Sequence, residues 1–239
     1  GEVVNKLNGS YITAGDVGTT NEDLLRVNKS TNYVGGIKLE TSGPTAVGIY
    51  NAINTTYNYL EKKPINNATV AISGIGKVGS KLAKLLFKKN VKLIISNLEK
   101  KNIEQLKKDK ILFIESNIDS IYEKKCDIIS PCALGGAINS NTKKKLNCKA
   151  IVGAANNQLD KSETADWLKK NNILYVPDYL VNSGGVIAIS CEINNSENIL
   201  NEYLNKISDK VLFLLKDSEN SSLSTDKIAE ELAWKRING

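Results

Sequence analysis

Methionine and histidine are both absent from this chain of 239 residues. Without Met there is no initiator residue, which indicates a fragment or a processed chain. Without His the chain cannot contain a Ser-His-Asp triad, and no imidazole can act as a general base. Acid–base chemistry must therefore use Asp, Glu, Lys or Tyr.

Cysteine is scarce, and its spacing does not suit a metal site. The chain has 4 Cys in all, no Cys-x-x-Cys pair and no His to complete a zinc site, so we expect no structural metal. Free thiols in a reducing cytoplasm are the expected state, and we therefore expect a cytoplasmic protein. The cysteines are Cys126, Cys132, Cys148 and Cys191.

Long hydrophobic runs are missing as well. No apolar stretch is long enough to cross a membrane, and no signal-peptide pattern is visible at the N-terminus. The net charge of +6 comes from scattered lysines, with no Arg-rich stripe between aromatics, so we expect neither a membrane nor a nucleic-acid partner. The length suits one large or two small globular domains.

The most informative stretch is a glycine turn between a strand and a helix. Residues 70–73 form a short apolar run, Gly74-x-Gly76-x-x-Gly79 follows, and an amphipathic helix is expected over 80–89. This context is the one that a dinucleotide-binding fingerprint requires. Gly74 makes the tight turn, Gly76 allows the backbone to approach a pyrophosphate, and Gly79 allows the helix to pack closely on the strand. The alternative is a merely tight strand-to-helix turn.

Strands alternate with helices from residue 68 to residue 180, which predicts an α/β fold with a Rossmann-like, doubly wound, mainly parallel sheet. Asn21 is expected to cap a helix that ends near Asn28, and residues 33–40 are expected to be a connector. The expected strands are 11–14, 70–73, 91–95, 111–114, 127–131, 150–153 and 173–176, and the expected helices are 2–7, 45–62, 80–89, 101–108, 140–146 and 162–170, with mainly helix over 186–239.

Polar and small residues follow the carboxyl ends of several expected strands. In an open α/β sheet this edge binds ligands, so the sequence predicts a cleft there. Ordinary loops are the alternative reading. The segments are 73–74, Asn97, 131–134, 155–158 and 182–185.

Five motifs occur together in this order in one known family. The chain resembles the glutamate/leucine/phenylalanine/valine dehydrogenases over essentially its whole length, and it is most similar to the leucine dehydrogenase branch. The motifs are Asp16-Val17-Gly18-Thr19, Gly74-x-Gly76-x-x-Gly79, and the segments 126–135, 155–159 and 177–186.

The resemblance implies oxidative deamination of an L-amino acid to a 2-oxo acid and ammonia, with hydride passing to a nicotinamide cofactor. It implies a small-molecule amino acid substrate and a homo-oligomer. It divides the chain into the remainder of an α/β substrate domain (1–38), a dinucleotide-binding Rossmann domain (39–195) and C-terminal helices that pack back toward the substrate domain (196–239). The two catalytic lysines of the family have no match and are expected upstream of residue 1.

Site residues follow from the same resemblance. Asp16 matches the catalytic Asp that assists proton transfer, although a loop or helix-capping carboxylate is the alternative. Ala14 matches the floor of the substrate side-chain pocket. Asn182 matches an Asn that approaches both nicotinamide and substrate amine. The other implied cofactor contacts are Thr45, Gly74, Gly76, Lys77, Val78, Gly79, Asn97, Cys132, Ala133, Leu134, Ala155 and Asn156.

Two positions depart from the family pattern. Asn97 stands where relatives usually have an Asp that accepts both hydroxyls of the adenine ribose, so the charge that repels a 2′-phosphate is gone. NAD remains the expected cofactor, but Asn97 also opens the use of NADP. Gly35 stands where relatives often have Thr, and the connector 36–45 looks shorter than theirs.

Three hypotheses remain open from the sequence. The first is an amino acid dehydrogenase of leucine dehydrogenase type, for which the resemblance implies a branched-chain, leucine-like substrate; the recognisable pocket residues are few and apolar, which disfavours glutamate. The second is a non-catalytic or regulatory dinucleotide-binding relative, suggested by the unmatched lysines and by Asn97. The third is a dehydrogenase of another substrate class on the same fold.

Overall fold

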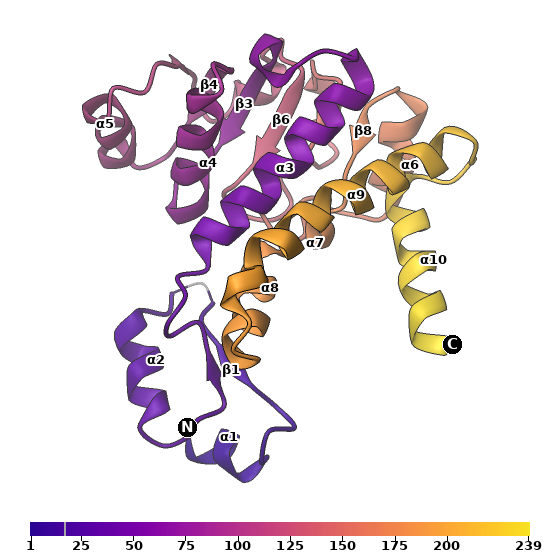
Figure 1. The fold of residues 1–239 in the computed structure, drawn as a ribbon. Helices are drawn as coiled ribbons and strands as arrows, with labels where there is room; N and C mark the ends of the chain where they lie inside the picture. Colours follow the sequence, from indigo (N-terminus) through magenta and orange to yellow (C-terminus); the bar gives the residue numbers. More distant parts are fainter. Residues whose placement is uncertain (17) are drawn as a thin grey trace.

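The computed structural model describes residues 1–16 and 18–239, so Val17 of the Asp16 motif lies outside the described residues. The chain forms a large α/β body and a small N-terminal lobe that lies apart from it (Figure 1). The lobe contains α1 (Glu2–Lys6), β1 (Thr13–Ala14), α2 (Asn21–Asn28) and β2 (Val34–Gly35).

A six-stranded parallel sheet forms the centre of the body, in the order β5-β4-β3-β6-β7-β8. This is the 3-2-1-4-5-6 order of a dinucleotide-binding Rossmann fold, so the predicted fold class is confirmed. The strand order reverses beside β3, whose residue Ser73 pairs with Pro131 of β6. The strands are β3 (Thr69–Ser73), β4 (Lys92–Ser96), β5 (Ile114–Glu115), β6 (Ile128–Pro131), β7 (Ala150–Ile151) and β8 (Leu174–Tyr175).

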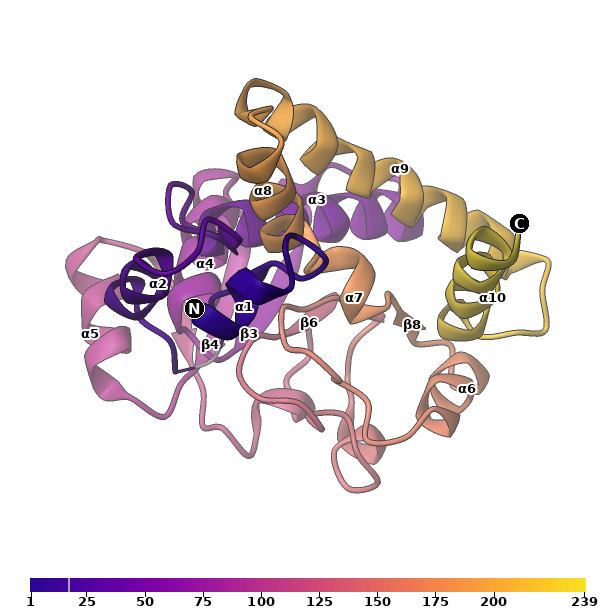
Figure 2. The same ribbon diagram turned by 90° about the horizontal axis from the view of Figure 1, so that it is seen from below.

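Apolar residues cover both faces of the central strands, as a parallel sheet between two helical layers requires. On β3, Val70 and Ile72 enter one core, which they share with α3 (Ser42–Glu61), α4 (Lys77–Lys88) and α9 (Leu200–Glu219). Ala71 points to the opposite face and joins a second core with Leu168 of α6 (Glu163–Lys170). Helices α3 and α9 lie side by side on the first face (Figure 2).

Helix α8 (Gly184–Ile193) connects the body to the lobe (Figure 1). At its first turn a Cβ on Gly184 would overlap the carbonyl oxygen of Pro44 in α3, so the two backbones are in close contact. Farther along, a Cβ on Gly35 of β2 would overlap the side chain of Ile189. The approach at Gly184 is to backbone and requires glycine, whereas at Gly35 the neighbour is a side chain; α8 thus packs closely on both parts of the molecule.

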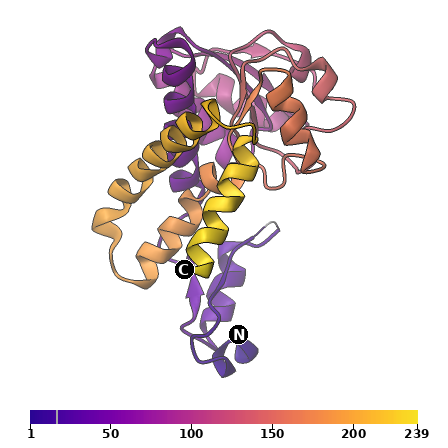
Figure 3. The same ribbon diagram turned by 90° about the vertical axis from the view of Figure 1, so that its right-hand side faces the viewer.

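The remaining elements complete the periphery. Helix α10 (Thr225–Asn238) extends away from the sheet and toward the level of the lobe (Figure 3). Within the described residues, no helix combines the length and apolarity needed to cross a membrane. The smaller elements are η1 (Ile65–Asn67), α5 (Lys100–Lys108), η2 (Ile121–Glu123), η3 (Lys143–Lys145), α7 (Asp178–Val181) and η4 (Glu197–Ile199).

Several predicted boundaries were wrong. Thr20, not Asn21, caps α2, because its hydroxyl accepts from the Asp23 N–H while the Asp23 carboxylate accepts from the Thr20 N–H. Helix α4 begins at Lys77, directly after Gly76. Strand β5 lies later than expected because Ile111 still bonds back to Leu106 at the end of α5.

The predicted connector also contains structure that the sequence did not reveal. Residues 34–35 form β2, which runs parallel to β1, with Thr13 opposite Val34 and Ala14 opposite Gly35. A two-residue strand has no periodicity, so only its partner identifies it.

Candidate active site

The glycine turn after β3 is shaped by close contacts on one side and open space on the other. Gly74 has φ +99°, and a Cβ there would lie 2.7 Å from the Cβ of Ala133. A Cβ on Gly79 would overlap the carbonyl oxygen of Gly74. Around Gly76, by contrast, a Cβ would meet no described atom within 4 Å. Gly74 and Gly79 thus serve the fold, whereas Gly76 leaves room for a ligand beside the backbone.

Asn97 at the end of β4 holds this turn. Its Oδ1 accepts a hydrogen bond of 2.8 Å from the Ile75 N–H, and its Nδ2 donates to the carbonyl oxygen of Glu99 at 2.9 Å. The amide therefore connects the glycine turn to the start of α5. A carboxylate could keep the first bond but could not donate the second.

A cavity of about 980 Å³ lies between the lobe and the carboxyl edge of the sheet. It brings Asp16 of the lobe together with Thr45 of α3 and with the glycine turn. The predicted site residues that line it are Asp16, Thr45, Gly74, Gly76, Lys77, Val78, Asn97, Cys132, Ala133 and Leu134. The predicted residues that do not line it are Ala14, Gly79, Ala155, Asn156 and Asn182.

Asn182 belongs to a second polar group, whose residues are not part of the cavity lining. Its Nδ2 donates to Oδ1 of Asn156 at 2.6 Å and to the carbonyl oxygen of Ala154 at 3.1 Å. Ala155 is buried between them. A Cβ on Gly185, three residues after Asn182, would lie 2.9 Å from Oγ1 of Thr45, which lines the cavity. The first turn of the helix that follows Asn182 therefore packs against Thr45 of the cavity wall.

Both backbone polar groups of Asp16 are hydrogen-bonded to the Thr19 side chain. Its N–H donates to Oγ1 of Thr19 at 2.7 Å, and that hydroxyl donates to the carbonyl oxygen of Asp16 at 2.6 Å. Asp16 follows β1 by two residues, and Thr19 and Thr20 line the same cavity. An exposed carboxylate in such a cavity can exchange a proton with a bound molecule or with water.

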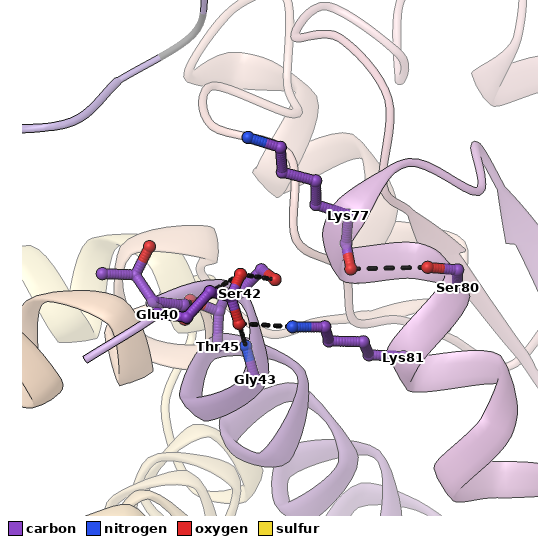
Figure 4. A network of polar contacts seen from close by, with 8 residues as sticks. Glu40, Ser42, Gly43, Thr45, Lys77, Ser80 and Lys81 are labelled. Atoms are coloured by element: carbon purple, nitrogen blue, oxygen red, sulfur yellow. Dashed lines mark hydrogen bonds and ion pairs between the residues drawn. The ribbon is translucent and has the colours of Figure 1, made fainter. Parts of the chain in front are cut away.

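Glu40, which lines the cavity, forms a network with Lys81 that we did not predict (Figure 4). The Glu40 carboxylate accepts from Lys81, from the Ser42 hydroxyl and N–H, and from the Gly43 N–H at 3.1 Å. Desolvation raises the pKa of Glu40, but these donors outweigh it and lower the pKa to about 2. Glutamate two residues before a helix was the sequence signal for the capping contact, because a carboxylate there can accept free N–H groups.

Lys77 and Cys132 also line the cavity, and their surroundings determine which chemistry each can perform. The Lys77 side chain points away from the Glu40 network (Figure 4), at the first turn of α4, where unpaired N–H groups and the helix dipole favour an anion. Burial raises the pKa of the Cys132 thiol, so this cysteine is a wall of the cavity and not a reactive thiolate. The arrangement suits a phosphate-containing ligand along the glycine turn, with Asp16 across the cavity.

The sequence is similar to several amino acid dehydrogenases. The sequence profile of "Glutamate/Leucine/Phenylalanine/Valine dehydrogenase" matches residues 35–97 and 88–220. Phenylalanine dehydrogenase of Thermoactinomyces intermedius is 34% identical over 249 residues, covering 99% of this chain and 67% of that protein. Leucine dehydrogenase of the same organism is 36% identical over 245 residues, covering 97% of this chain and 66% of that protein.

The solved structures agree with the sequence comparison. L-tryptophan dehydrogenase from Nostoc punctiforme superposes with a TM-score of 0.87 at 31% identity, over 99% of this chain and 70% of that one. The chain spans about two thirds of the length of the curated relatives it matches. With the Rossmann strand order, the glycine turn and the Asp16 cavity, these matches show that the chain belongs to the glutamate/leucine/phenylalanine/valine dehydrogenase family of oxidoreductases.

Proposed function

We propose that the protein oxidatively deaminates an L-amino acid with a branched, leucine-like side chain to the 2-oxo acid and ammonia, using NAD or NADP. The observation that supports this best is the shared cavity, in which Asp16 faces the same space as the glycine turn and Thr45. A carboxylate and a dinucleotide site in one cavity combine proton transfer with hydride transfer.

The cofactor site is proposed to follow the glycine turn. The open space beside Gly76 fits a pyrophosphate, and the first turn of α4 supplies N–H groups and Lys77. At the adenine end Asn97 brings no negative charge, and Lys100 and Lys101 begin α5 close by. Lys101 is ion-paired with Glu99 at 2.9 Å. NAD is the expected cofactor, and the neutral side chain of Asn97 supports use of NADP as well.

The chain's own residues would act on the substrate from both sides of the cavity. Nicotinamide, when bound, accepts the hydride from the substrate α-carbon. We propose that Asp16 moves protons between the substrate nitrogen and water, and that Asn182 orients the amine and the nicotinamide amide. Orientation of this kind lowers the barrier because the reacting atoms are already placed when they meet.

The named relatives of this chain differ in the amino acid in their names. They include phenylalanine, leucine and L-tryptophan dehydrogenases at similar identity. We propose a leucine-like substrate with Ala14 at the floor of its pocket. Ala14 pairs with Gly35, and both residues have small side chains, which leave room for the substrate side chain. We also propose a homo-oligomer and a cytoplasmic location, consistent with the four unpaired cysteines.

A binding and turnover experiment tests the proposal. The intact protein is titrated with NADH and with NADPH by nucleotide fluorescence, and reduction of NAD and NADP is then followed with L-Leu, L-Val, L-Ile, L-Phe, L-Trp and L-Glu. Turnover that is fastest with the branched substrates supports the proposal. Faster turnover of L-Phe or L-Trp would overturn the side-chain assignment. Tight cofactor binding without any turnover would favour the non-catalytic relative.

A further inference from the structure

A buried carboxylate on α8 binds three consecutive backbone N–H groups of the segment that joins the lobe to the body. Glu192 is only 7% exposed. Its Oε1 accepts from Ile37 N–H at 3.1 Å and from Lys38 N–H at 3.2 Å, and its Oε2 accepts from Leu39 N–H at 3.1 Å. Both carboxylate oxygens thus accept from the backbone of this one segment.

The segment held by Glu192 is the connector 36–41 between β2 and α3. It starts at Gly36, whose φ of +80° turns the chain so that the next three N–H groups face one oxygen pair. Ile37 and Lys38 also line the cavity that contains Asp16. The connector is therefore both the covalent link between the two parts and a wall of the site.

On the lobe side, the connector continues directly from the strand pair that precedes Asp16. Gly35 at the end of β2 pairs with Ala14 at the end of β1, and Asp16 follows two residues later. Anything that fixes residues 37–39 thus also fixes the end of β2, the paired β1 and the start of the Asp16 loop.

On the body side, the helix that carries Glu192 begins beside Asn182. Helix α8 starts at Gly184, two residues after Asn182, and has 10 residues. Its length is about 15 Å at roughly 1.5 Å per residue. One short rigid element therefore has the Asn182 group at one end and Glu192 at the other.

We propose that Glu192 is a positioning residue that sets the placement of Asp16 relative to Asn182 and the glycine turn. This proposal rests on the proposed function, since it assigns Glu192 a role in that reaction. Glu192 does not line the Asp16 cavity, and it acts through the connector. Its removal disturbs the alignment of substrate and nicotinamide, while the cofactor contacts of the glycine turn are left in place.

The test compares Glu192→Gln, Glu192→Ala and the matched surface variant Glu202→Gln in the intact protein. Gln has nearly the shape of Glu, but it has only one acceptor oxygen. Its NH₂ group is a donor that faces at least one connector N–H, also a donor, so at least one hydrogen bond is lost. Glu202 lies exposed on α9 in an ion pair with Lys206, and its change to Gln removes the same charge without touching the connector. Circular dichroism confirms folding of each variant.

Three measurements are made on each variant. Hydrogen exchange of the 37–39 amides should speed up about ten- to hundredfold in Glu192→Gln and more in Glu192→Ala, because bonds to a charged acceptor are lost. The Kd for NADH should change less than about threefold, whereas kcat should fall about tenfold or more, as expected for a loss of orientation. Glu202→Gln should match the wild type in all three.

The outcomes separate the two proposals. Suppose first that the wild type binds NADH and turns over. If Glu192→Gln then keeps the wild-type kcat, or loses kcat only in proportion to its loss of NADH affinity, Glu192 is a packing residue and the inference is overturned. A wild type that neither binds NADH nor turns over defeats the proposed function. In that case, if the 37–39 amides of Glu192→Gln exchange at the wild-type rate, the hydrogen bonds from these amides to Glu192 are refuted as well. If they exchange faster, Glu192 holds the connector but has no role in the reaction.

Discussion

At the scale of single residues, Asp16 is the side chain on which the proposed chemistry depends most. Its N–H donates to Oγ1 of Thr19, and it lines the cavity with the glycine turn. Asp16→Asn keeps the size of the side chain but removes its ability to take up a proton at ordinary pH. We expect kcat to fall about 10²- to 10⁴-fold, the usual contribution of general acid–base catalysis.

Steady-state kinetics and NADH titration test this variant together. The Kd for NADH should stay near the wild-type value, because the cofactor contacts come from α4 and the sheet edge. Asp23→Asn is the control, since Asp23 only caps α2 through Thr20. An Asp16→Asn protein with wild-type kcat would make Asp16 a loop carboxylate, the alternative that the sequence left open.

Asn97 decides the cofactor preference in our interpretation. Asn97→Asp adds a negative charge at the adenine end, which repels a 2′-phosphate, and it loses the donor to Glu99. We expect the NADPH-to-NADH ratio of Kd values to rise about tenfold, equivalent to about 1.4 kcal/mol. Asn67→Asp, in η1 before β3, serves as the charge control. An unchanged ratio would show that the side chain at position 97 does not distinguish a 2′-phosphate from a 2′-hydroxyl on the adenine ribose.

Glu40 gives a prediction for pH. Its pKa is lowered from the usual 4.5 to about 2 in the folded protein, by donors that outweigh its desolvation. The contribution to stability is therefore complete above about pH 4.5 and disappears as the pH falls toward 2. Glu40 and its ion-pair partner Lys81 both have exposed side chains. We therefore expect Glu40→Gln to lower the free energy of unfolding by at most about 1 kcal/mol at pH 7.

Thermal unfolding of the wild type and Glu40→Gln between pH 7 and pH 3 measures this contribution. The difference in Tm should shrink as the pH is lowered. A difference that stayed constant down to pH 3 would assign the effect to packing. Glu104→Gln, in the exposed ion pair of α5 with Lys107, provides a matched comparison.

At the scale of elements, the strand–turn–helix unit of β3 and α4 contains two glycines with opposite roles. A Cβ at Gly76 meets no described atom within 4 Å, so Gly76→Ala should fold with wild-type Tm yet bind NADH at least about tenfold more weakly. A Cβ at Gly79 overlaps backbone, so Gly79→Ala should lose about 1–3 kcal/mol of stability. Tm and NADH titration of the pair separate the two roles, and equal loss of stability in both would contradict the assignment.

Elements could be predicted from the sequence where their own residues determine them, and not where a distant partner does. The fingerprint, the long α3 and the central strands have their own apolar pattern and turn residues, so the sequence located them. Strand β2 has no such pattern and exists only because β1 lies beside it. The start of α2 was misplaced by one residue, because Thr20 and Asn21 are both good caps and only the Asp23 contact distinguishes them.

At the scale of the whole molecule, the predicted site residues came from motifs far apart in sequence, and the strand order brings most of them to one edge. The sequence could name Asp16, the glycine turn and residues 132–134, and the structure shows that one cavity contains them. It could not identify the Glu40–Lys81 pair or Glu192, although the position of Glu40 before α3 signalled its capping contact. Their roles arise from contacts across lobes and helices, 41 positions apart for Glu40 and Lys81 and 155 for Glu192 and Ile37.

The contact between α8 and the connector has a consequence for the order in which the molecule folds. The connector leaves the ribosome long before Glu192 is synthesised, because 155 positions separate Ile37 from its acceptor. Such distant contacts form late and slow the folding of the parts that need them. We therefore expect the central strands to become protected first and the 37–39 amides last in pulse-labelled refolding. Early protection of those amides would contradict this order, and confirmation would make the lobe the last region to reach its native state.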